Sequence, residues 1–191
     1  MTASRFVGFA LLAAIVAAAL LTAAPAGAQY SKSWDFLEAV EDGDRKEMRN
    51  LLNQGGNPNG RNGDGIPAMV LAGDKGDVSL MAYLLELGVN IDGFTANRRE
   101  TALMRRAEVG NTTVVRFLIE NGANPDLKDK GGETALMKAT RSRKRGVIKL
   151  LIEAGADVNL SDFTGRTALS YAEESRSRGI IRLLIESGAS E

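Results

Sequence analysis

The stretch GGETALMKATRSRKRGVIKLLIEAGADVN, residues 131–159, decides the fold because close copies of it occur elsewhere in the chain. One copy is RTALSYAEESRSRGIIRLLIESGAS at 166–190, and another is ETALMRRAEVGNTTVVRFLIENGANPD at 100–126. Looser copies are IPAMVLAGDKGDVSLMAYLLELGVNID at 66–92 and SWDFLEAVEDGDRKEMRNLLNQGGNPN at 33–59. A fixed period of this length is the signature of stacked repeats.

The period is 33 residues, with one extra residue between the second and third copies. Equivalent apolar residues follow one another at spacings of 33, 34, 33 and 33, and these are Phe36, Met69, Leu103, Leu136 and Leu169. Glycines near the end of each copy keep the same spacing, namely Gly55, Gly88, Gly122, Gly155 and Gly188. The sequence therefore predicts five units, at about 33–61, 62–95, 96–128, 129–161 and 162–191.

Each unit has the pattern of two short antiparallel helices followed by a turn. Thr101, Thr134 and Thr167 stand where a helix begins, and a hydroxyl there can accept a hydrogen bond from a free backbone N–H. The second helix carries an apolar stripe, and the glycine after it ends the helix in the left-handed conformation. One such unit is too small to bury its own apolar side, so neighbouring units must stack. The prediction is an all-α solenoid with short hairpin loops.

The units resemble ankyrin repeats over residues 33–189, on the motifs TALM, TALS and GADVN and on the period. TALM and GADVN look like the variety common in bacterial ankyrin proteins. Several positions depart from the family pattern: Pro67-Ala68 stands where Thr-Pro is usual, and Arg106 replaces a small residue. Arg143 and Arg176 replace the glycine between the helices of a unit. Gly146 and Gly179 follow three residues later, which predicts a reshaped turn in the last two units.

The first 28 residues have the composition of a secretory signal peptide. Arg5 precedes the apolar run FVGFALLAAIVAAALL, and Ala26 and Ala28 fit a cleavage site before Gln29. We therefore expect a repeat domain over 29–191 that is periplasmic or secreted. The alternative is an uncleaved anchor, because the apolar segment is nearly long enough to span a membrane.

Composition argues against catalysis. The chain has no cysteine and no histidine, which removes thiol nucleophiles, zinc sites built on these residues and the usual proton carrier near neutral pH. GDGIPA, residues 63–68, loosely matches a dinucleotide-binding fingerprint, but that fingerprint requires a preceding strand. We expect no enzyme, no cofactor and no metal site.

The basic run RSRKR does not by itself indicate nucleic-acid binding. The repeat places Arg141 at the end of a first helix and residues 143–145 in the turn that follows, where the first unit has the acidic EDGDRK. Aromatic residues make up 5% of the chain, and nucleic-acid binding favours aromatic platforms or an extended basic face. We therefore expect no nucleic-acid partner.

Charge is unevenly distributed along the chain. Residues 29–92 contain 11 acidic and 6 basic residues, whereas residues 93–191 contain 13 acidic and 17 basic ones. This difference predicts a stack that is acidic at its start and basic at its finish. Such a stack could associate head to tail.

The ankyrin resemblance implies that the chain binds another protein through its hairpin tips and the concave face of the first helices. Mapped onto this sequence, the tips are Asn97, Arg98, Glu100, Lys130, Glu133, Phe163, Thr164 and Arg166, and the concave face includes Asp74, Lys75, Glu108 and Arg141. Phe163 beside Arg166 fits an interface anchor, because aromatic and arginine side chains dominate interface energy. Alternatively, Phe163 folds over a neighbouring hairpin.

The sequence thus predicts an exported, non-catalytic protein-binding module, with a role such as modulating or protecting an exported partner. The rival hypothesis is a structural or self-associating element held at the membrane by an uncleaved N-terminal segment. Only in that second case does the chain contact a membrane.

Overall fold

The structure is a computed structural model that describes residues 26–190. The signal peptide predicted over 1–28 lies outside these residues except for its last three, and it stays a prediction. The described residues form helices and no strands. The helices are α2 (Ala26–Asp42), α3 (Arg45–Asn53), α4 (Ala68–Lys75), α5 (Val78–Glu86), α6 (Ala102–Val109), α7 (Thr112–Glu120), α8 (Ala135–Arg141), α9 (Arg145–Glu153), α10 (Ala168–Glu174) and α11 (Arg178–Glu186).

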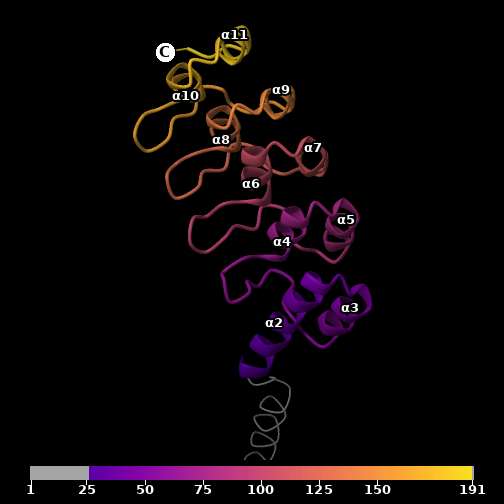
Figure 1. The fold of residues 1–191 in the computed structure, drawn as a ribbon. Helices are drawn as coiled ribbons and strands as arrows, with labels where there is room; N and C mark the ends of the chain where they lie inside the picture. Colours follow the sequence, from indigo (N-terminus) through magenta and orange to yellow (C-terminus); the bar gives the residue numbers. More distant parts are fainter. Residues whose placement is uncertain (1–25, 191) are drawn as a thin grey trace, which may run out of the picture.

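The helices pair and stack into an elongated solenoid (Figure 1). The first helices of the pairs contact one another in sequence along the stack, from α2 through α4, α6 and α8 to α10. The second helices form a parallel row beside them, and the loops between pairs project from the opposite side (Figure 1). The predicted all-α repeat solenoid is confirmed.

The first helices begin at the threonines that the sequence indicated. The hydroxyls of Thr101 and Thr134 accept hydrogen bonds from the backbone N–H groups of Met104 and Met137, at 3.3 and 3.4 Å. Thr167 caps α10 in the same way. These bonds satisfy donors that have no partner within the helix.

The turn within each pair keeps one geometry throughout the stack, so the predicted reshaping in the last two units is wrong. Gly76 and Gly110 have φ of 72° and 86°, and at the same place Arg143 and Arg176 have φ of 55° and 51°. Arginine tolerates this left-handed conformation at a cost of roughly 1–2 kcal/mol.

Backbone hydrogen bonds explain why the turn is retained. The N–H of Lys144 donates to the carbonyl of Ala139 at 2.8 Å, which closes the end of α8. The N–H of Asn111 makes the equivalent bond in the preceding pair at 3.0 Å. Gly146 lies inside the first turn of α9 and does not replace the missing glycine.

A continuous apolar core runs along the stack between the two rows of helices. The five equivalent residues that defined the period are all buried, and so are Met104 and Met137. Within the last pair, Ile180 and Leu184 are buried, whereas Ile185 is exposed. Ser170 and Glu173 stand where the preceding repeat has the buried Met137 and Thr140, so this end of the stack presents polar groups on its first helix.

Candidate functional site

The loops between helix pairs are tight hairpins organised by one side chain at their base. Oδ1 of Asp129 accepts hydrogen bonds from the backbone N–H groups of Gly131 and Glu133, at 2.8 and 3.0 Å. Oδ1 of Asp162 does the same for Thr164 and Arg166, also at 2.8 and 3.0 Å. Short acidic side chains favour such turns for this reason. In both hairpins the second carboxylate oxygen, Oδ2, contacts a residue of the first helix that follows.

Lys138 of α8 fills the space beneath the third hairpin and is fully buried. Its Nζ lies 2.8 Å from Oδ2 of Asp129, 2.9 Å from Oε1 of Glu100 and 3.4 Å from Oε2 of Glu133. Burial by itself lowers the pKa of Lys138, but hydrogen bonds to Asp129 and Glu100 hold that pKa above its usual value. Lys138 therefore stays charged and joins carboxylates from two consecutive hairpins.

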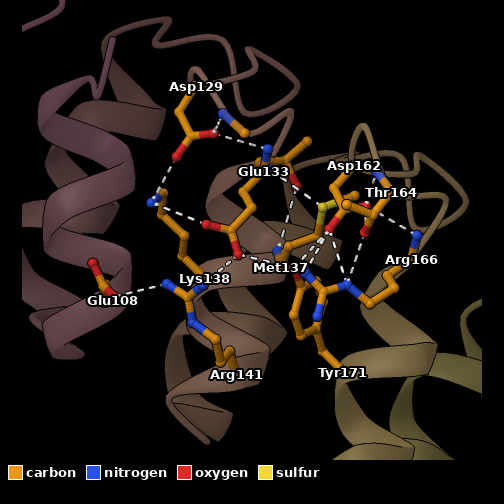
Figure 2. Close-up of polar contacts among 12 residues, drawn as sticks. Glu108, Asp129, Glu133, Met137, Lys138, Arg141, Asp162, Thr164, Arg166 and Tyr171 are labelled. Carbon is orange, nitrogen blue, oxygen red and sulfur yellow. Dashed lines mark hydrogen bonds and ion pairs between the residues drawn. The ribbon is translucent and has the colours of Figure 1, made fainter. Parts of the chain in front are cut away.

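Tyr171 occupies the same position in the next repeat and replaces the ammonium with a phenol. Its hydroxyl lies 2.7 Å from Oδ2 of Asp162 and 3.0 Å from Oε1 of Glu133 (Figure 2). Burial and these two carboxylates raise the pKa of Tyr171, so the phenol stays protonated. Burial alone would raise the pKa of Asp162, but hydrogen bonds from Thr164 and Tyr171 hold it well below its usual range.

Arginines extend this network toward the concave surface. Arg141 contacts Glu133 and also lies 3.0 Å from Oε1 of Glu108. One repeat earlier, Arg105 lies 2.6 Å from Oδ2 of Asp74 and 3.7 Å from Oε2 of Glu100. We call the set Glu100, Arg105, Asp129, Glu133, Lys138, Arg141, Asp162 and Tyr171 the hairpin-base network.

Two of the predicted tip residues belong to this network and not to the surface. Glu100 and Glu133 are 3% and 8% exposed, so the prediction that they lie at accessible tips is wrong. The cause is ion pairing with α8. Lys138 pairs with Glu100 and Arg141 pairs with Glu133, and these contacts hold both carboxylates under the hairpins.

The other predicted residues lie at or near the surface. Exposed tip residues are Asn97, Arg98, Lys130, Phe163, Thr164 and Arg166. On the concave face Lys75 and Arg141 are exposed, whereas Asp74 and Glu108 are partly buried. Sequence reasoning missed Arg61 and Arg99, whose guanidinium groups lie 4.7 and 4.6 Å from the centre of the Phe94 ring. The repeat period located these loops, but it did not indicate that the two arginine side chains lie against the Phe94 ring.

Phe163 combines both arrangements considered for it. Its ring lies against Gly132, where an added Cβ would come within 2.8 Å of the ring. The same side chain is 71% exposed, so its other side faces solvent. The ring therefore covers a neighbouring hairpin and still presents apolar surface to solvent.

Backbone hydrogen bonds connect the hairpin tips to one another. The N–H of Ala96 donates to the carbonyl of Gly65 at 2.9 Å, and the N–H of Lys130 donates to that of Arg98 at 2.9 Å. The N–H of Phe163 donates to the carbonyl of Gly131 at 3.1 Å. These bonds hold the tips in a fixed row. We call the following set of exposed residues on these hairpins the tip row: Arg61, Asn97, Arg98, Arg99, Lys130, Phe163, Thr164 and Arg166.

The RSRKR run lies where the repeat placed it, in and beside the turn between α8 and α9. Arg141 belongs to the hairpin-base network, and Nη2 of Arg143 donates to the carbonyl of Ser175 at 2.7 Å. Lys144 packs its side chain over Gly110, where an added Cβ would lie 2.7 Å from it. Several of these basic side chains therefore make contacts within the stack.

A second surface feature lies at the first repeat. Trp34 is 52% exposed and rests on Gly63, and a hollow of about 360 Å³ opens beside its ring. The hollow is also lined by Glu38, Glu41 and Asp64. This end of the stack is therefore acidic.

The other end of the stack is not basic, contrary to the prediction. Residues 162–191 contain five acidic and four basic residues, whereas residues 96–161 contain 8 acidic and 13 basic ones. The basic excess thus lies in the third and fourth units. This removes the simple charge argument for head-to-tail association.

Within residues 26–190, no group of acidic side chains is arranged to hold a metal ion. Over the same residues, none of the helices has the length and apolar content needed to cross a membrane.

Comparison with known proteins identifies the repeats. A family model described as "Ankyrin repeats (3 copies)" matches residues 36–129 and 103–191. An ankyrin repeat-containing protein of Treponema pallidum (strain Nichols) is 32% identical over 99 residues, which make up 52% of this chain and 33% of that protein. "Ankyrin repeat, SAM and basic leucine zipper domain-containing protein 1" of Mus musculus is 45% identical over 56 residues, or 29% of this chain and 12% of that protein.

A third relative, "Ankyrin repeat and SAM domain-containing protein 6" of Mus musculus, is 32% identical over 114 residues, which cover 59% of this chain and 13% of that protein. The match thus spans a third or less of the length of each of these relatives. What the similarity identifies is the repeat unit.

Proposed function

Because the chain belongs to the ankyrin repeat family, we propose that it is a non-catalytic module that docks another protein on the tip row and the adjoining concave surface. Ankyrin repeats generally mediate protein–protein interaction. The proposal follows this general role and adds the surface that carries it out.

The fixed row of hairpin tips is the observation that carries the proposal. A partner that docks on it does not have to order the loops, so less conformational entropy is lost on binding. Phe163 supplies exposed apolar area at the fourth tip, and the exposed Arg166 lies three residues later in the same hairpin. Aromatic and arginine side chains are the commonest interface anchors.

The titratable groups with strongly shifted pKa values support a structural role more than a catalytic one. Asp162 and Tyr171 shift each other's pKa through a direct hydrogen bond beneath a hairpin. Both are buried. Buried groups that hydrogen-bond to each other in this way stabilise a loop. A catalytic group, in contrast, must be accessible to a substrate.

We place the module in the periplasm or outside the cell, on the strength of the N-terminal sequence. Arg5, the apolar run and the small residues at Ala26 and Ala28 are the features that support export. The role there is to modulate or protect an exported partner. The second candidate is a structural element held at the membrane by the uncleaved segment, and mass spectrometry of the N-terminus of the exported protein separates the two.

Site-specific photo-crosslinking in cells tests the docking surface. A crosslinking amino acid at Phe163 is expected to capture a partner protein, whereas the same amino acid at Arg116, exposed on α7, is not. The variant Lys130→Ser, with the crosslinker kept at Phe163, is expected to reduce the capture. Equal capture at Phe163 and Arg116 would count against the tip row as the docking surface.

A further inference from the structure

Folding sorts the charges of the hairpins by sign. The three hairpin segments 94–101, 129–134 and 162–167 together contain four acidic and four basic residues, so their sequence is neutral. The acidic ones are Glu100, Asp129, Glu133 and Asp162, and the basic ones are Arg98, Arg99, Lys130 and Arg166. Nothing in the linear pattern separates the two groups, because each of the three segments contains residues of both signs.

The structure buries every acidic member of this set and exposes every basic one. The exposed fractions of Glu100, Asp129, Glu133 and Asp162 are 3%, 6%, 8% and 5%. All four basic residues are exposed. From Arg98 to Arg166 the tip row therefore presents a positive surface, although these three hairpins carry no net charge. The first hairpin is not sorted in this way, because Arg61 and Asp64 are both exposed there.

The sorting follows from the hairpin-base network. Lys138 and Tyr171 rise from the first helices under the hairpins and take up carboxylate oxygens of Asp129, Glu133 and Asp162. Asp129 and Glu133 are thereby paired with the ammonium of Lys138, whereas Asp162 keeps its charge and accepts a hydrogen bond from the neutral phenol of Tyr171. All three carboxylates are covered from solvent. The basic side chains of the tips have no comparable set of buried partners, although Arg98 and Arg166 lie 3.8 and 3.2 Å from carboxylates beneath them.

From this charge sorting we propose that the tip row binds an acidic segment of the partner protein, one that also places an apolar side chain on Phe163. The inference rests on the proposed function and names the chemistry of the partner. Positive potential over the row attracts carboxylates and raises the association rate. Phe163, with its 71% exposure, gives the segment a second, apolar contact in the same row.

A protein segment fits this surface better than a single-stranded nucleic acid. Binding of unpaired bases relies on several aromatic faces that stack with them. On the tip row Phe163 offers one such face, whereas the nearby Phe94 already has the guanidinium groups of Arg61 and Arg99 against it. Acidic protein segments need no stacking platforms.

Selection of short random peptides against the full chain tests the proposal. Peptides retained by the wild type are synthesised, and their affinities are measured for three variants: Arg98→Ser/Lys130→Ser on the tip row, Phe163→Ser, and the control Arg116→Ser/Lys149→Ser. The control removes the same charge from exposed positions on α7 and α9. Circular dichroism verifies that all variants retain their helix content.

The expected result is a set of acidic peptides with an apolar residue. Loss of the two tip charges should weaken their binding about tenfold or more, and added salt should weaken it further. Phe163→Ser should weaken binding as well, and the control should leave it unchanged.

Other outcomes overturn one proposal or both. Peptides that depend on Phe163 but are neutral or basic, and ignore the tip charges, would refute the acidic segment and leave the proposed function standing. Selected peptides whose affinity is the same for the wild type and for both tip variants would refute the proposed function. A selection that enriches no peptide would also refute it. A single-stranded oligonucleotide could bind more tightly than any selected peptide and lose affinity in the tip-charge variant. That result would refute the proposal that the occupant is a protein segment. If the chain forms salt-sensitive dimers that the tip-charge variant does not form, the occupant of the tip row is a second copy of the chain, and the acidic segment of another protein is refuted.

Discussion

The first two repeats and the last three solve the same packing problem with different chemistry at the base of the hairpins. In repeats three to five this position on the first helix is held by Arg105, Lys138 and Tyr171, all of which contact carboxylates. In the second repeat it is held by Leu71, which packs against the apolar core, and in the first by the exposed Glu38. The helix pairs stack in both regions.

This difference shows that the apolar core is enough to form the stack and that the hairpin-base network has another effect. A buried ion pair contributes little net stability compared with apolar packing, yet it costs a great deal when one partner is removed. Here the network joins hairpins of neighbouring repeats to the helices and hides their acidic groups. It therefore sets the position and the surface charge of the tips.

The largest effect is expected from Lys138→Met. The change leaves Glu100, Asp129 and Glu133 buried without their ammonium partner, and we expect a loss of roughly 3–5 kcal/mol in the free energy of unfolding. Urea denaturation measures it. Lys149→Met, which removes an exposed lysine from α9, should cost less than about 0.5 kcal/mol. Similar losses in the two variants would show that the network is dispensable.

A smaller loss is expected from Tyr171→Phe. Removal of the hydroxyl leaves Asp162 and Glu133 without this donor, and unsatisfied buried acceptors cost roughly 1–3 kcal/mol. Tyr83→Phe is the matched change in the second repeat, where a partly exposed hydroxyl donates to the carbonyl of Arg45 at 2.8 Å. Thermal melts should show the larger decrease for Tyr171→Phe, and the reverse order would contradict the comparison.

Acid should weaken the stack through the carboxylates of the network. The pKa values of Asp129 and Asp162 lie below their usual range in the folded state, where burial opposes and hydrogen bonds favour the charged form. Their contribution is present above the unfolded-state pKa of about 3.9 and is lost as pH falls toward the folded-state pKa. At pH 4 we expect a loss below ~1 kcal/mol per carboxylate.

Urea denaturation between pH 7 and pH 3 measures this loss. Asp162→Asn should make the dependence on pH shallower, because one of the two groups no longer titrates. The variant and the wild type would have parallel pH profiles if the network carboxylates do not contribute.

The smallest effect is expected at the turn within the last pair, and it has the opposite sign. Arg176 has φ of 51°, which is strained for arginine and ordinary for glycine. We expect Arg176→Gly to raise the free energy of unfolding by about 0.5 kcal/mol, the difference between relief of this strain and the higher entropy of unfolded glycine. Gly110→Ala, at φ of 86° in the third pair, should lower it by about 1 kcal/mol. A loss of stability in Arg176→Gly would contradict the strain argument.

Features that depend on neighbours in the chain were predicted well. The period is visible in the sequence itself. The threonine caps and the left-handed turns depend on contacts within a few residues, so the sequence pattern predicts them. The turn at Arg143 was mispredicted because glycine is the usual residue there, whereas backbone hydrogen bonds retain the turn without it. The candidate site was harder to predict. The tips were located correctly, but the burial of Glu100 depends on Lys138, which lies 38 residues away.

The sequence by itself determined that the chain repeats, that each unit is a helix pair with an apolar stripe, and that the pairs must stack. Only the tertiary structure decided which charges of the hairpins remain accessible. Acidic and basic residues are mixed within each of these loops, and the acidic ones are buried where a lysine or a tyrosine of an adjacent helix lies beneath them. Burial is a property of the three-dimensional neighbourhood, and a carboxylate is buried where a partner satisfies it.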